Sequence, residues 1–245
     1  MCNTFISGAT GKVGRILIEK ILEDADLKLV GGSASRDSNY LGKDLGSLIG
    51  KYNLNINIIK DISEANDIDL IIDFSRPQHS IAVLRFARKE NIPMVIGTTG
   101  FNEVELNEIN EISKEIPLLI APNTSLGMAL FKKILDHSKE VINIASSLEI
   151  HEHHHKEKKD KPSGTAINIK KQLKGVSSNK DIQIESIREG NSPGVHTLKM
   201  SFEDETLEIS HKVTDRSIFA KGAIIAGKWL KDKPPGPYNM QDIYS

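Results

Sequence analysis

The stretch Thr4-Phe5-Ile6-Ser7-Gly8-Ala9-Thr10-Gly11-Lys12-Val13-Gly14 leads a short apolar run directly into a glycine-rich turn. The apolar residues that follow recur at helical spacing and predict a helix. A glycine-rich turn between a strand and a helix lets the backbone approach a pyrophosphate, which then lies at the helix N-terminus. Gly-x-x-Gly-x-x-Gly is a variant of the usual Gly-x-Gly-x-x-Gly spacing, and taken alone it also matches a plain tight turn. We expect a dinucleotide to contact Gly8, Ala9, Thr10, Gly11, Lys12 and Val13.

Alternating strands and helices continue the pattern to about residue 121. Strands are expected at 28–32, 57–59, 69–74, 94–96 and 118–120. Pro77 is placed to open a helix that runs to Arg88, and Asn102 is placed to cap a helix over 103–115. Short apolar strands separated by helices indicate a parallel sheet of the Rossmann type.

The strand ends are rich in glycine and hydroxyl residues. Because ligands of open parallel sheets bind at the carboxyl ends of the strands, these strand ends are expected to converge with the glycine turn on one crevice. The expected coenzyme residues there are Phe74, Ser75, Gly97, Thr98, Thr99, Ala121, Pro122, Asn123 and Thr124. After the second strand, where an acidic residue usually binds the ribose hydroxyls, the chain has Ser35 and Arg36 instead.

The pattern changes after Ser125. A long helix from Leu126 to about Asn143 precedes a strand at 147–151, and strands then follow at 182–188, 195–202 and 206–213. Strands that follow one another without helices between them indicate a largely antiparallel sheet. We therefore expect a second, α+β domain over residues 122–216, after a dinucleotide-binding domain over residues 1–121. A final helix is expected from Ile218 to Leu230.

The segment from Glu152 to Thr165 crowds histidines and lysines against the start of a helix. Pro162-Ser163-Gly164-Thr165 opens that helix, so free N–H groups and the positive end of the helix dipole favour a carboxylate or phosphate there. Proton donors beside an anion site indicate a small anionic substrate that is protonated during its reaction.

Three other interpretations of this segment stay open. It could be a charged surface loop. A metal site is less favoured, because neighbouring histidines in an extended segment alternate sides and no His-x-x-x-His helix pattern is present. Nucleic-acid binding is also disfavoured, because acidic residues interrupt the lysine run, no aromatic residue is interleaved and the formal net charge of the chain is −1.

Composition gives a broad class. The chain has 245 residues, of which 38% are hydrophobic and 27% are charged, as in an ordinary globular protein. No apolar run approaches the ~20 residues that cross a bilayer, and no signal-peptide pattern is present. The single Cys2 agrees with a reducing compartment, so a cytoplasmic location is expected.

The whole set of motifs resembles the 4-hydroxy-tetrahydrodipicolinate reductase (dihydrodipicolinate reductase) family, over nearly the full length. The most specific match is to the family pattern Glu-x-His-His, two residues, Lys, one residue, then Asp-x-Pro-Ser-Gly-Thr-Ala, which spans Glu152 to Ala166. Further matches are Gly8–Gly14, Asp73–Pro77, Gly97–Phe101, Ala121–Gly127, and Arg216 with Phe219–Ala223.

The resemblance implies hydride transfer from NADH or NADPH to a cyclic imine dicarboxylate in lysine and diaminopimelate biosynthesis, with loss of water. It makes His154 and Lys158 the proton-donating pair, His155 a substrate contact, and Gly164 and Thr165 the carboxylate anchor. It also implies a homotetramer joined through the second-domain sheet, with residues 217–245 returning to the nucleotide domain. No metal, nucleic-acid or membrane partner is expected.

Two departures from the family pattern matter. The region 175–188 is shorter than in many members, which leaves its effect on assembly open. Ser35 stands where an acidic residue is often found, and with Arg36 beside it we expect NADPH to be used at least as well as NADH. The alternative of another class is a non-catalytic nucleotide-sensing protein that has a Rossmann fold and uses its histidines as a surface or metal module.

Overall fold

The computed structural model describes residues 1–177 and 180–244, so residues 178 and 179 of the shortened region and the terminal Ser245 lie outside it. The described chain divides into two compact units, which are Met1–Ser125 with Ser217–Ile243, and Leu126–Arg216 with Tyr244. We call them unit 1 and unit 2. Among the described residues, no helix combines the length and the apolar character that crossing a membrane requires.

Unit 1 is built on a seven-stranded sheet in the order β11-β6-β5-β4-β1-β2-β3, and every strand pair in it is parallel. Its strands are β1 Cys2–Ser7, β2 Leu27–Ser33, β3 Ile58–Ile59, β4 Leu70–Asp73, β5 Met94–Ile96, β6 Pro117–Ile120 and β11 Gly236–Tyr238. The helices are α1 Lys12–Leu22, α2 Pro77–Glu90, α3 Glu103–Ile112 and α7 Ser217–Leu230, with short 3₁₀ turns at Leu45–Ile49, Ile62–Glu64 and Asp242–Tyr244.

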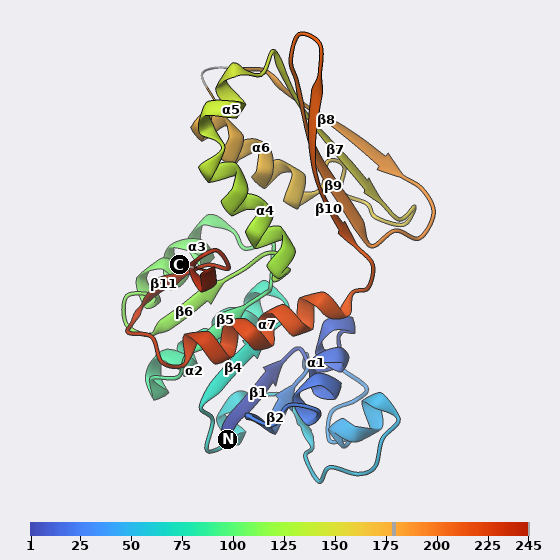
Figure 1. Cartoon of the computed structure of the whole chain (residues 1–245). Helices are drawn as coiled ribbons and strands as arrows, with labels where there is room; N and C mark the ends of the chain where they lie inside the picture. Colours follow the sequence, from blue (N-terminus) through green and yellow to red (C-terminus); the bar gives the residue numbers. More distant parts are fainter. Residues whose placement is uncertain (178–179, 245) are drawn as a thin grey trace. The chain divides into compact units, whose positions relative to one another are not determined.

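Helix α1 packs beside α7, and α2 packs beside α3 (Figure 1). The central strands β4 and β5 are buried along their whole length, which explains their continuous apolar runs. The cap at Asn102 is confirmed as a reciprocal capping box with Glu105, and α2 begins at Pro77 as predicted.

Strand β11 was not predicted, because it lies in the proline-rich stretch after the last helix. It pairs with β6 at the edge of the sheet, where Pro237 lies opposite Leu118. An edge strand tolerates proline, because at positions that face away from the sheet no N–H is needed to bond a neighbouring strand.

Unit 2 contains a four-stranded sheet in the order β10-β9-β7-β8. Its strands are β7 Ser147–His154, β8 Ile182–Arg188, β9 Gly194–Ser201 and β10 Thr206–Val213. The pairs β7–β9 and β9–β10 are antiparallel, while β7 and β8 are parallel and are joined through helix α6 Gly164–Val176. A parallel pair needs such a crossover, whereas antiparallel neighbours need only a hairpin.

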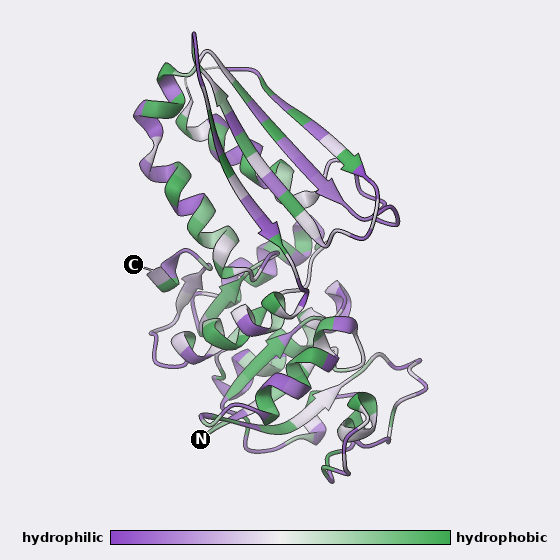
Figure 2. Ribbon diagram, turned by 45° about the vertical axis from the view of Figure 1, so that its right-hand side comes forward, coloured by the Kyte–Doolittle hydropathy of each residue, from purple (hydrophilic) through white to green (hydrophobic). Residues whose placement is uncertain are grey.

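The helices of unit 2 and the core-facing side chains of the sheet form its apolar core, which includes Phe131, Ile150, Ile169 and Leu198. Figure 2 shows the alternation of apolar and polar residues along the strands that puts one face toward these helices. The predicted long helix is two helices, α4 Leu126–His137 and α5 Lys139–Ile144. Ser138 interrupts them, and its hydroxyl donates to the Ile134 carbonyl 2.7 Å away, a contact that bends helices.

Candidate active site

The glycine-rich turn joins β1 to α1. Gly11 occupies the cap position of α1, and no side chain caps the first N–H groups of the helix. Gly8 has a φ of +82°, and a Cβ there would lie 2.2 Å from the Phe74 carbonyl oxygen. A Cβ at Gly14 would lie 2.3 Å from the Gly8 carbonyl oxygen. The turn therefore needs glycine at both positions, and its uncapped N–H groups suit a phosphate.

The carboxylate of Asp73, at the end of β4, connects the ends of three strands through hydrogen bonds. Its buried carboxylate accepts hydrogen bonds from the hydroxyls of Ser7 (2.5 Å), Ser75 (2.5 Å) and Thr98 (2.6 Å). The Thr98 hydroxyl oxygen in turn accepts from the Ser75 N–H at 2.8 Å. Because β1, β4 and β5 all end here, this network fixes the loops that carry the predicted nucleotide residues.

Two adjoining cavities of about 230 Å³ each open at these strand ends. The first is lined by Gly8, Thr10, Gly11, Ser35, Phe74, Ser75, Arg76 and His79, and the second by Gly11, Lys12, Val13, Phe74, Ser75, Gly97, Thr98 and Thr99. They share Gly11, Phe74 and Ser75. A dinucleotide has two halves joined by a pyrophosphate, so paired cavities that meet at the glycine turn match its shape and charge.

Some predicted coenzyme residues do not line these cavities. Ala9 is fully buried under the turn, and its N–H donates to the Ser33 carbonyl at 2.9 Å. Arg36 is exposed. Residues 121–124 follow β6, where the Thr124 hydroxyl donates to the Phe219 carbonyl at 2.7 Å and so holds the loop to α7.

The structure adds His79, which the sequence did not single out for this crevice, beside Arg76 of the expected strand end 74–76. The His79 Nε2 lies 2.9 Å from the Ser33 hydroxyl, and His79 is half-buried in the first turn of α2. Burial lowers the pKa of His79, although Asp73 and Asp61 counteract part of this effect. The sequence signal was limited to the helix start at Pro77, because only the fold brings that turn beside β2.

In unit 2, strand β7 extends to His154, so His153 and His154 lie on a strand rather than in the segment after it. The pleat turns Glu152 and His154 to the buried face of the sheet and His153 to the other face. His154 is 6% exposed and Glu152 is 1% exposed. The interpretation as a surface loop therefore holds only for the stretch after the strand, where Lys156, Glu157 and Lys159 are exposed.

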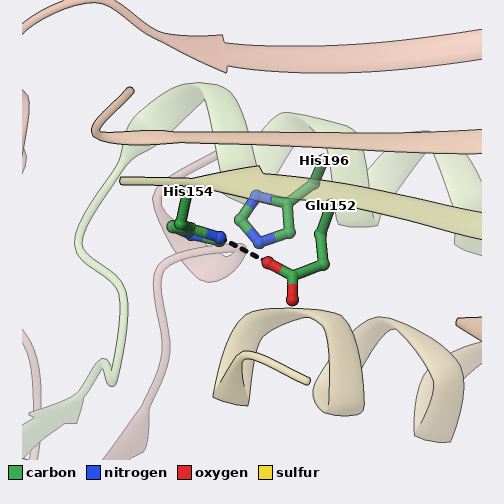
Figure 3. A group of neighbouring side chains, drawn as sticks. All are labelled: Glu152, His154 and His196. Atoms are coloured by element: carbon green, nitrogen blue, oxygen red, sulfur yellow. Dashed lines mark ion pairs between the residues drawn. The ribbon is translucent and has the colours of Figure 1, made fainter. Parts of the chain in front are cut away.

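Glu152 is the centre of a buried ion-pair cluster. One of its oxygens accepts from Arg188 Nη2 at 2.6 Å and from the Ser163 N–H at 3.2 Å. The other oxygen is paired with His154 Nδ1 (Figure 3). Burial alone would raise the pKa of Glu152, but the Arg188 hydrogen bond, the charge of His154 and the Ser163 N–H outweigh it and lower the pKa to about 2. Glu152 is therefore a carboxylate at neutral pH.

The two histidines of the cluster are held toward the neutral form. Burial lowers the pKa of His154, Glu152 opposes this, and Lys158 and Arg188 add to it. Burial and the neighbouring His154 lower the pKa of His196 to about 3. The two rings meet edge to face with centroids 5.0 Å apart, and His196 Nε2 lies 3.2 Å from the Ser163 hydroxyl. A proton on His154 is thus weakly held and available for transfer.

The other predicted substrate residues lie along the loop and the helix start that follow β7. Lys158 forms an ion pair with Asp160 at 2.7 Å, and its side chain is about a quarter exposed (24%). His155 is half-buried and holds the loop through its N–H to the Ser192 carbonyl. Gly164 and Thr165 open α6, which Ser163 caps by accepting the Ala166 N–H at 3.2 Å.

Glu152, His154 and His196 also offer ligand atoms that lie within 4.8 Å of one another, as a metal site would. However, Arg188 already neutralises the Glu152 carboxylate, and the Ser163 N–H donates to the same oxygen. A cation there would face Arg188 and Lys158. The donor set therefore suits proton transfer better than metal binding.

A Rossmann-like parallel sheet with paired cavities at its strand ends, and a second unit with a buried Glu–His pair, are features of the nucleotide-dependent oxidoreductases. Comparison with known proteins narrows this class. Residues 2–124 match the family model described as dihydrodipicolinate reductase, N-terminus, and residues 127–244 match the model described as dihydrodipicolinate reductase, C-terminus. The chain belongs to the dihydrodipicolinate reductase family.

Individual relatives agree. The chain is 33% identical over 263 aligned residues to a 4-hydroxy-tetrahydrodipicolinate reductase of Hahella chejuensis, covering 99% of this chain and 98% of the relative. It is 34% identical over 259 residues to the enzyme of the same name from Buchnera aphidicola subsp. Schizaphis graminum, covering 97% and 95%.

A solved structure has the same fold. It is a dipicolinate-bound dihydrodipicolinate reductase from Paenisporosarcina sp. TG-14, with a TM-score of 0.80 at 20% identity and coverage of 99% of both chains. An amine dehydrogenase from Mycobacterium smegmatis shares the fold more distantly, with a TM-score of 0.73 at 10% identity and coverage of 98% and 96%.

Proposed function

We propose that the protein reduces 4-hydroxy-tetrahydrodipicolinate to tetrahydrodipicolinate with a reduced nicotinamide coenzyme and releases water, in diaminopimelate and lysine biosynthesis. The observation that carries this proposal is the buried Glu152–His154 pair, placed beside Lys158 and the start of α6 in a chain of this family. A non-catalytic nucleotide sensor would not need a buried proton donor next to an anion site.

The balance of the reaction defines the task of unit 2. The 4-hydroxyl group leaves as water together with a proton from the neighbouring ring carbon, the bound coenzyme would supply a hydride to C4, and one proton from the protein would complete the reduction. Hydride addition places negative charge on the conjugated carbon–nitrogen system of the substrate. A cationic donor beside that charge both stabilises it and delivers the proton.

We assign the proton-donating pair to His154 and Lys158. His154 is buried and its proton is weakly held, while Lys158 supplies positive charge in the same segment. His155 is proposed to contact the substrate. The N–H groups of Gly164 and Thr165, at the positive end of α6, are proposed to hold a substrate carboxylate.

The coenzyme is proposed to lie across the two cavities of unit 1, with its pyrophosphate on the glycine turn. Arg36 follows β2 where a carboxylate would repel a 2′-phosphate, so NADPH is expected to bind at least as well as NADH. Residues 121–124 are proposed as further contacts at the end of β6.

We also propose a homotetramer that is joined through the open face of the unit 2 sheet. In the described part of unit 2, the helices cover one face of this sheet, and the other face carries half-buried residues such as Val195 and Thr197. A monomeric mass in light scattering would contradict this assembly. A cytoplasmic location suits a biosynthetic reductase that draws on the pools of reduced coenzyme, and cell fractionation tests it.

The direct test of the function is to mix the purified protein with freshly made substrate and each coenzyme. We expect oxidation of NADPH and NADH that depends on the substrate, and tetrahydrodipicolinate as the product by mass spectrometry. Coenzyme binding without any turnover would favour the sensor interpretation. The amine-bearing product of a reductive amination would place the chain in a different reaction class.

A further inference from the structure

Glu152 connects every part of the buried cluster in unit 2. Glu152 and His154 lie on strand β7, and Arg188 lies on strand β8. Ser163 is the residue immediately before α6. Figure 3 shows the carboxylate beside the neighbouring rings of His154 and His196, with its ion pair to His154 marked. Since Glu152 is fully buried and ionised, its contacts are made in a low-dielectric environment and are costly to leave unpaired.

The first consequence concerns which nitrogen of His154 reacts. Nδ1 of His154 lies in ion-pair contact with the Glu152 carboxylate, and an unprotonated nitrogen would turn its lone pair toward an ionised oxygen, so the contact favours a proton on Nδ1. Nε2 is then the atom that exchanges a proton. A Cβ at Gly194 would lie 2.9 Å from this nitrogen, so any side chain at that position would crowd the Nε2 edge of the ring.

The second consequence concerns the start of α6. The Ser163 N–H donates to Glu152, and the Ser163 hydroxyl both accepts from the Ala166 N–H and lies against His196 Nε2. Arg188 also donates to the Asp160 carbonyl at 2.6 Å, which holds the preceding loop. The same carboxylate thus orients the proposed proton donor and positions the helix start that is proposed to hold the substrate.

We propose that Glu152 is a positioning residue for the reduction, which fixes the Nδ1–H form of His154 and the start of α6 as one unit. This inference rests on the proposed function, because it assigns the purpose of the cluster to that reaction. Arg188 completes the unit by neutralising the carboxylate, so that Glu152 can stay buried and ionised without taking up a proton itself.

Because charged groups surround His154, the proposal predicts how the activity depends on pH. The titratable and charged groups around His154 come from four strands and a loop. They are Glu152 on β7, Arg188 on β8, His196 on β9, His211 on β10 next to His196, and Lys158 with its partner Asp160 in the loop. Of the charged groups that shift the pKa of His154, Glu152 raises it and so favours the imidazolium, whereas Lys158 and Arg188 lower it.

The direction of the pH effect follows from that environment. His154 donates from Nε2 only when it is protonated, so activity falls as the pH rises through its pKa. Removing the carboxylate lowers this pKa further and moves the falling limb to lower pH.

The test compares Glu152→Gln with Glu108→Gln. Glu108 also pairs with an arginine, 2.6 Å from Arg85, but it lies on α3 of unit 1 and is not assigned to any proposed site or interface. We expect Glu152→Gln to lower kcat by roughly two powers of ten, as the loss of a residue that orients a catalytic group does. Its KM for the substrate should rise, its falling pH limb should move to lower pH, and its coenzyme dissociation constants should stay unchanged.

The controls separate positioning from folding. Glu108→Gln should keep wild-type kcat and pH limb, and Glu152→Asp, which restores the charge, should return the pH limb toward that of the wild type. A Glu152→Gln variant that keeps wild-type kcat, or that loses kcat without any shift of the pH limb, would overturn the proposal.

A measurement on the unmodified protein covers the case in which Glu152→Gln does not fold. Nitrogen-15 NMR of the histidines, with the His154 signal assigned by its absence in His154→Gln, reports the tautomer directly. The Nδ1–H form is expected, and the Nε2–H form would overturn the proposal. Because the NMR measurement does not depend on turnover, it distinguishes a failure of the Glu152 proposal from a failure of the proposed reaction.

Discussion

At the residue scale, His79 and His154 show how partners separate two histidines that are both withdrawn from water. Burial lowers the pKa of each, but His154 is paired with a carboxylate and His79 with the hydroxyl of Ser33. A histidine beside a carboxylate can be charged and transfer a proton. One beside a hydroxyl acts as a neutral hydrogen-bonding group, which suits contact with the sugar of a nucleotide.

His79 and Arg36 are expected to affect coenzyme binding differently. His79→Ala should weaken NADH and NADPH alike, by about tenfold, because one hydrogen bond to the shared ribose is lost. Arg36→Ala should weaken NADPH selectively, because only NADPH carries the 2′-phosphate. Fluorescence titration with both coenzymes measures this, and His137→Ala, on the exposed end of α4, is the control. A clear wild-type preference for NADH, or an Arg36→Ala variant with no selective loss of NADPH, would contradict the coenzyme proposal.

Local patterns in the sequence were sufficient to predict the glycine turn, the strand ends and the helix start at Ser163. The partners of Glu152 were beyond such patterns, because Arg188 and His196 are 36 and 44 residues away in the chain and reach it only through sheet pairing. His79 was missed as a coenzyme-site residue for the same reason, because nothing in the sequence places the first turn of α2 beside β2. Long-range register, rather than residue type, was the missing information.

At the element scale, the start of α6 is the feature on which substrate binding is proposed to depend. A Cβ at Gly164 meets no atom within 4 Å, so the fold itself can accept a larger residue there. A side chain at Gly164 would fill the space in front of the first N–H groups of α6.

Gly164→Val is therefore expected to raise the KM for the substrate strongly while the protein stays folded. Gly175→Val is the matched control, because Gly175 is exposed near the other end of the same helix and a Cβ there also meets nothing within 4 Å. Steady-state kinetics of the two variants decide this point. An unchanged KM in Gly164→Val, or a co-crystal with pyridine-2,6-dicarboxylate bound away from α6, would place the carboxylate anchor elsewhere.

Elements also show where pattern-based prediction was wrong. The expected single helix after Leu126 is broken at Ser138 by a hydroxyl-to-backbone hydrogen bond, which competes with helical pairing. Strand β11 was missed because proline disfavours strands in general, although it is tolerated at an edge. In both cases a specific local contact outweighed the average preference of the sequence.

At the scale of the whole molecule, the chain divides two chemical tasks between two sheets of different construction. The parallel sheet of unit 1 gathers strand ends at one edge, as a coenzyme with two halves requires. The mixed sheet of unit 2 uses its pleat to bury an acid–base cluster on one face and to leave the other face for the proposed assembly. The account therefore predicts that damage to unit 2 chemistry leaves coenzyme binding intact.

The most direct test of the central claim follows deuterium from C4 of a labelled reduced coenzyme to C4 of tetrahydrodipicolinate, in the wild type, His154→Gln and Lys158→Ala. The account predicts that the label arrives at C4 in the wild type, and that each variant lowers the rate of transfer by roughly two to four powers of ten, as the loss of a positioned acid does. Coenzyme dissociation constants should barely change. Transfer at a near-normal rate in either variant, or deuterium at another carbon, would contradict it.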